Sequence, residues 1–114
     1  MEVLDRGVLQ RLRRNVGDEV FLDLAKQVVD DLARLRKEIV DSLDRDDFES
    51  VRHAMHELKG LAGLFGASVL ARSCSDLMSL SASPKEVRRK RFAKTLALCS
   101  STRHFIEDEV LKSA

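Results

Sequence analysis

The chain has 114 residues, and we expect residues 1–114 to form a single domain, because this length suffices for one hydrophobic core. Charged residues make up 34% of the sequence, but the formal net charge is only +1, so we expect neither nucleic acid nor a membrane as a partner. No apolar run approaches the roughly 20 residues of a membrane span, and the N-terminal segment lacks the apolar core of a signal peptide.

The first two predicted elements are a short helix and a long amphipathic helix. The short helix is marked by apolar residues at a spacing of four, namely Leu4, Val8 and Leu12. It should end near Gly17, after which Asp18 can serve as the N-cap of a long helix over residues 18–43. The apolar positions of the long helix are Phe21, Leu24, Val28, Leu32, Leu35 and Ile39.

The third predicted helix follows an acidic turn. Asp46 as N-cap and Glu49 three residues later match a capping box. Apolar residues then alternate at spacings of three and four: Phe48, Val51, Met55, Leu58, Ala62 and Phe65. Gly66 should end the helix, because glycine tolerates the left-handed conformation common at helix C-termini.

Two more helices are predicted in the C-terminal half. The fourth is marked by Leu70, Cys74, Leu77 and Leu80. The start of the fifth is predicted by a cap at Ser83, Pro84 in the first helical position and Glu86 closing the box. Its apolar positions are Phe92, Leu96, Cys99, Ile106 and Val110, and Arg103 interrupts them at an expected apolar position.

These elements predict an all-α fold, an antiparallel four-helix bundle with an additional short N-terminal helix. The Met and Phe positions are expected in its core, with no cofactor site among them. Cys74 and Cys99 lie in apolar-periodic stretches, which favours buried free thiols in a reducing compartment over a disulfide. A cytoplasmic location is expected on this ground.

His56 lies outside the apolar stripe of the third helix. At 100° per residue it falls roughly 130° from the centre of the stripe, so it should face water. His53, Gly60 and Gly63 project along the same flank, and Lys59 lies one turn beyond His56. An interior glycine destabilises a helix by about 1 kcal/mol relative to alanine, so two on one exposed face require a reason. The reason is either close packing against a neighbouring helix or close approach of another protein's backbone to His56.

The stretch HELKGLAGLFG resembles the signature of histidine-containing phosphotransfer (HPt) domains. His56, Lys59, Gly60 and Gly66 occupy the four signature positions, and the order of the predicted helices is similar over most of the chain. Met55 stands where the family usually has alanine, but methionine fits the apolar stripe. The departure therefore affects only the local core.

The resemblance implies a phosphoryl carrier rather than an enzyme. His56 would take a phosphoryl group from an aspartate of one receiver domain and pass it to an aspartate of another, while Lys59 would hold the phosphoryl oxygens. Gly60, Gly63 and His53 would lie on the docking surface. The implied partners are receiver domains of response regulators and hybrid sensor kinases. The chain would act as a monomer without a cofactor, and the receiver would bring any magnesium.

Other interpretations of the sequence predict different roles. One is a helical module that binds receivers or kinases without transferring phosphate, and another is a bundle enzyme such as a metal-carboxylate oxidase. The oxidase requires Glu-x-x-His pairs, which the sequence lacks. His53 and His56 have no suitable neighbours to complete a metal site, so none is expected. The basic run PKEVRRKR is interpreted as a solvated face or a contact for an acidic partner.

Overall fold

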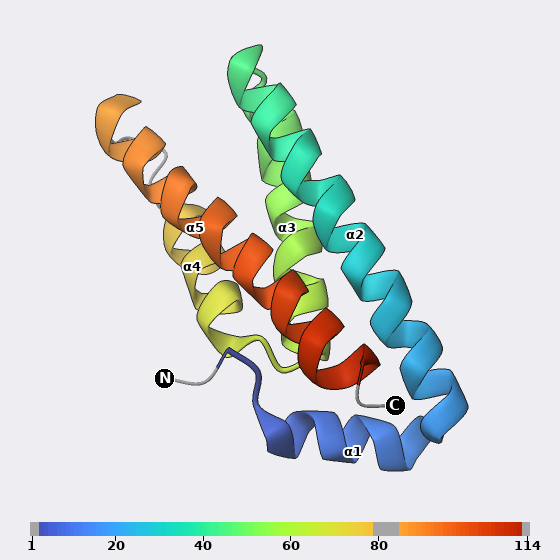
Figure 1. The fold of residues 1–114 in the computed structure, drawn as a ribbon. Coiled ribbons are helices and arrows are strands. Elements are labelled where there is room, and N and C mark those ends of the chain that lie inside the picture. The colour runs from blue at the N-terminus through green and yellow to red at the C-terminus, as the bar shows by residue number, and fades with distance from the viewer. Residues whose placement is uncertain (1–2, 79–84, 113–114) are drawn as a thin grey trace.

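The computed structural model describes residues 3–78 and 85–112, except the side chains of residues 85–89. The elements in these ranges are α1 (Arg6–Val16), α2 (Asp18–Asp44), α3 (Phe48–Leu64), α4 (Ser68–Met78), α5 (Lys85–Phe105) and the π-helix η1 (Ile106–Leu111), which continues α5. Helices α2 to α5 alternate in direction, and α1 lies across one end of them (Figure 1). The predicted all-α bundle with a short N-terminal helix is therefore confirmed.

Each bundle helix packs against two others. Helix α2 contacts α3 and α5, and α4 contacts the same two helices, so the order around the bundle is α2, α3, α4, α5. The core comes mostly from the predicted stripes and includes Phe21, Val28, Leu32, Leu35, Ile39, Val51, Met55, Leu58, Ala62, Leu70, Cys74, Leu77, Phe92 and Cys99. Full burial of a large apolar side chain contributes about 1.5 to 3 kcal/mol. These stripes therefore fix the face that each helix turns inward.

The predicted N-cap at Asp18 is wrong. Gly17, with φ of 87°, occupies the cap position of α2, and Asp18 is the first helical residue. The Asp18 carboxylate accepts a hydrogen bond of 2.6 Å from Arg13 Nε instead. A carboxylate in the first turn still interacts favourably with the helix dipole. The charge of Asp18 therefore stabilises α2 although Asp18 is not its N-cap.

The predicted N-cap at Asp46 is also wrong, by one residue. Asp47 caps α3, and its carboxylate accepts hydrogen bonds from the Ser50 backbone N–H at 3.2 Å and the Ser50 hydroxyl at 2.7 Å. These bonds lower the pKa of the Asp47 carboxyl, chiefly through the Ser50 side chain. Asp46 has φ of 55° and belongs to the preceding turn. Aspartate is a favourable N-cap residue at either position, but only Asp46 has the Glu of a capping box three residues later, and the turn geometry selects Asp47.

Two residues expected in the core are exposed. Phe48 is 43% exposed and Met78 is 39% exposed. Phe48 is the first residue of α3 and Met78 the last residue of α4, so each lies at a helix end rather than over the bundle interior. The predicted positions Leu80, Ser83 and Pro84 and the side chain of Glu86 lie outside the described residues.

The inward face of α5 contains threonines rather than Arg103. Thr95 and Thr102 are buried, whereas Arg103 is half-buried. The Thr102 hydroxyl donates to the Leu98 carbonyl at 2.7 Å, and the Thr95 hydroxyl donates to the Arg91 carbonyl at 3.2 Å. Because a threonine hydroxyl can bond the preceding helical turn, these side chains enter the core without an unsatisfied group.

The end of α3 agrees with the prediction. Phe65 is the C-cap of α3, and Gly66 follows with φ of 75°. The Gly66 carbonyl accepts a 2.7 Å hydrogen bond from the Asp5 N–H, and a Cβ on Gly66 would lie 3.0 Å from the Asp5 carbonyl oxygen. Glycine is needed here both for the backbone conformation and for this close approach, which ties the segment before α1 to the turn between α3 and α4.

The cysteines are buried free thiols, as predicted. Burial raises the pKa of Cys74 to about 12 and that of Cys99 to about 11. In the described part of the chain, no helix combines the length and apolar character required to cross a membrane.

Candidate functional site

His56 is exposed on the outer face of α3, as predicted. Helix α3 packs between α2 and α4, and it turns Val51, Met55 and Leu58 into the core. His56 lies near the middle of the helix on the face away from these buried residues. Its imidazole is therefore accessible to a protein that approaches from solvent.

Two cationic residues flank His56 on the side of α3 nearer α4. Arg52 precedes His56 by four residues and Lys59 follows it by three, and both are exposed. On an α-helix these positions lie about 40° and 60° from His56, in the same direction around the axis. The charge of Lys59 partly offsets the effect of burial on the pKa of the Cys74 thiol, which is consistent with Lys59 lying on the α4 side.

The opposite side of His56 contains an ion-pair network between α2 and α3. Arg34 of α2 pairs with Asp31 at 3.6 Å, with Glu38 at 3.1 Å and with Glu57 of α3. Its hydrogen bond to Glu57 is the main cause that raises the pKa of the Arg34 guanidinium. The carboxylate that follows His56 in sequence is thereby held against a cation of α2.

Gly60 and Gly63 lie on the exposed surface of α3 beyond His56. A Cβ on either glycine would meet nothing within 4 Å. Close packing against a neighbouring helix, one of the two reasons considered for these glycines, therefore does not explain them. His53 is exposed as well and lies one turn before His56.

Sequence reasoning missed Leu64, which is 48% exposed at the end of α3. It follows Gly63 directly and adds an apolar side chain to the exposed part of this helix. Its position two residues after Ala62, outside the apolar stripe, was an available signal of exposure.

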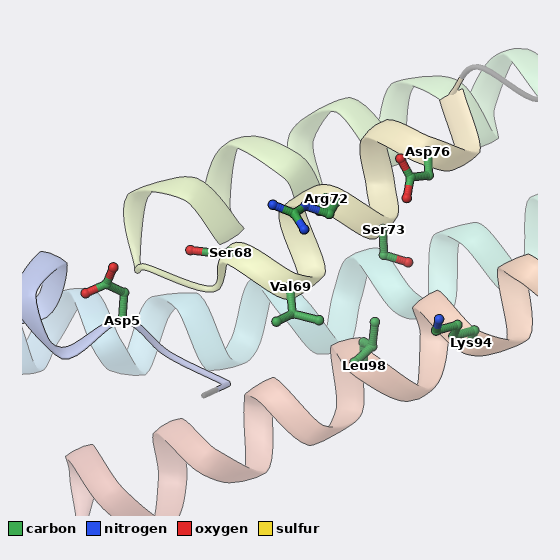
Figure 2. A pocket seen from close by; sticks show the side chains of 8 residues that line it. All are labelled: Asp5, Ser68, Val69, Arg72, Ser73, Asp76, Lys94 and Leu98. Atoms are coloured by element: carbon green, nitrogen blue, oxygen red, sulfur yellow. The ribbon is translucent and has the colours of Figure 1, made fainter. Parts of the chain in front are cut away.

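A groove of about 370 Å³ lies between α4 and α5, but none of the predicted site residues lines it. Figure 2 shows its lining side chains, which are Asp5, Ser68, Val69, Arg72, Ser73, Asp76, Lys94 and Leu98. Carboxylates and cations both occur among them, so the groove favours neither sign of charge. Within residues 3–78 and 85–112, no group of three or more His, Cys, Asp or Glu side chains is arranged to hold a metal ion.

Comparison with known families gives one match, to the Hpt domain, over residues 19–110. The matched range contains the whole of α3, α4 and α5, and hence His56 and Lys59. No curated protein and no solved structure matches the chain.

Proposed function

Because the chain belongs to the Hpt domain family, we propose that it carries a phosphoryl group on His56 between receiver-domain aspartates of a phosphorelay. Hpt domains are phosphocarrier modules of two-component signalling rather than enzymes, and they interact with receiver domains. The observation that carries the proposal for His56 is its exposed position on α3, where the turns that follow it present Lys59, which has no ion pair with a described residue, and two glycines with open space above them.

The transfer step follows from the chemistry of the two groups. A ring nitrogen of neutral His56 attacks the phosphorus of a receiver's aspartyl phosphate with its lone pair, and an N–P bond forms. The P–O bond to the aspartyl oxygen breaks, and the aspartate leaves as a carboxylate with the electron pair. The other ring nitrogen can then release its proton to water. Attack by a second receiver's aspartate carboxylate reverses these changes and frees His56.

Lys59 supports this step as a point charge. Its ammonium lies one helical turn from His56 and has no ion pair with any described residue, so it is available to the phosphoryl oxygens. A cation near the transferring group stabilises the charge on its oxygens. Any magnesium in the step belongs to the receiver domain, whose own carboxylates would hold it.

Gly60 and Gly63 form the proposed docking path, with His53 at its other end. Since neither glycine has a side chain and the space above both is open, a receiver backbone can approach α3 beside His56. A receiver must bring its aspartate within bonding distance of the imidazole, and this requires a surface without protruding side chains beside the histidine. The presence of His56 and Lys59 beside this surface supports transfer over a module that only binds receivers.

The test is phosphorylation of the purified chain by a phosphorylated receiver domain. His56→Gln should abolish the acid-labile label and change the free energy of unfolding by no more than about 0.5 kcal/mol, because the residue is exposed. His53→Gln leaves the phosphoryl-accepting imidazole in place and should still take the label, although its rate also reports docking. A label that survives in His56→Gln and disappears in His53→Gln would assign the chemistry to the other histidine.

A further inference from the structure

We infer that Arg52 is a second phosphoryl-binding cation, so that a phosphoryl group on His56 lies between the Arg52 guanidinium and the Lys59 ammonium. The inference rests on the proposed function of His56 and adds a residue to its site. It follows from three observations: the spacing of Arg52 on α3, its lack of an ion pair with any described residue, and the ion pair that holds Glu57 against Arg34.

The spacing brings both cations to one histidine. Arg52 lies about 6 Å before His56 along the helix axis and Lys59 about 4.5 Å after it, on the same side. Side chains on an α-helix lean toward its N-terminus. The His56 ring therefore leans toward the turn that carries Arg52, and Lys59 leans toward His56, whereas Arg52 starts away from His56 and must bend its long side chain back to meet the phosphoryl group. A phosphoryl group on the ring extends further in the direction of Arg52.

Arg52 is available for this contact. Within the described ranges, Arg13, Arg34 and Arg103 form ion pairs, whereas Arg52 forms none. Glu49, one turn before Arg52, does not pair with it. An exposed guanidinium without a carboxylate partner can donate two parallel hydrogen bonds to phosphoryl oxygens, which a lysine ammonium cannot match in geometry.

The charge balance also favours two cations. A phosphoryl group carries about two negative charges near neutral pH, so Lys59 alone neutralises half of this charge. The Glu57 carboxylate would oppose a phosphoryl group at the adjacent residue, but Arg34 pairs with it on the α2 side. The cations of Arg52 and Lys59 then match the phosphoryl charge without competition from that carboxylate.

The experiment uses ammonium phosphoramidate, a small donor that has no protein surface to dock. The wild-type chain should be labelled on His56, as mass spectrometry after proteolysis and the His56→Gln variant would establish. Arg52→Gln should then slow labelling and the return transfer to a receiver by about tenfold, because it removes hydrogen bonds to a charged group. Arg52→Lys should recover part of the rate, since it restores the charge without the two parallel donors.

The control is Arg14→Gln, which removes an exposed arginine of α1 that also lacks an ion pair with the described residues. It should label at the wild-type rate. Wild-type labelling of Arg52→Gln with phosphoramidate would overturn the inference, and so would a defect confined to the receiver reaction, which would make Arg52 a docking residue. A wild-type chain that takes no label on His56 would overturn the proposed function itself.

Discussion

Replacing Gly60 by alanine should stabilise the protein, although glycine occupies a signature position. The added Cβ would meet nothing within 4 Å, so no neighbouring atom opposes it. Helix propensity alone then sets the change, and alanine is favoured over glycine inside a helix by about 0.8 to 1.0 kcal/mol. For a domain of this size, such a gain should raise the melting temperature by roughly 3 to 5 °C.

Gly66→Ala is the matched control and should have the opposite sign. Gly66 has φ of 75°, and its added Cβ would lie 3.0 Å from the Asp5 carbonyl oxygen and 3.2 Å from the Val8 Cβ. The left-handed conformation alone costs a residue other than glycine about 1 to 2 kcal/mol, and the contacts with Asp5 and Val8 add to that. The same substitution at two glycines should therefore shift stability in opposite directions.

Thermal unfolding followed by circular dichroism measures both variants. A lower melting temperature for Gly60→Ala would refute the argument, because it would mean that the glycine packs against a neighbour. The docking proposal is tested separately with Gly60→Gln and Gly63→Gln, which should melt at or slightly above the wild-type temperature and lose transfer from a phosphorylated receiver. If either glutamine variant transfers normally, that glycine does not belong to the docking path.

Two further predictions concern Lys59 and the buried thiols. Lys59→Ala should slow phosphoryl transfer in both directions and Lys59→Arg should keep part of the rate, whereas equal rates for alanine and wild type in stopped-flow assays would remove Lys59 from the mechanism. Because burial raises the pKa of Cys74 to about 12, folding holds this thiol neutral, so its contribution to stability is complete below about pH 8.5 and is lost as pH rises toward 12. Urea unfolding at pH 8 and pH 10 should show this fall in the free energy of unfolding. If a Cys74→Ala variant loses as much free energy of unfolding between the two pH values as the wild type, the fall does not come from Cys74.

The helices could be predicted because their apolar periodicity is strong. The predicted range 18–43 differs from the observed α2 by one residue at its end, and the C-terminal stop of α3 at Gly66 is correct. The capping errors at Asp18 and Asp46 have a local cause. In each case a neighbouring residue adopts positive φ or takes the cap position, and composition cannot show which residue of a polar turn does so. Phe48 was misjudged because periodicity carries no information on where the core ends.

Some features of the candidate site follow from the geometry of α3 alone, whereas others depend on how α2 and α3 pack together. The positions of Lys59 and Gly60 relative to His56 follow from the repeat of α3 alone, and sequence suffices for them. Which charges remain available to a phosphoryl group depends on the register of α2 against α3, which places Arg34 beside Glu57 across 23 residues of sequence. No spacing rule within α3 predicts that contact. With Glu57 paired, the charges left beside His56 on α3 are cationic, and this favours a site that receives an anion.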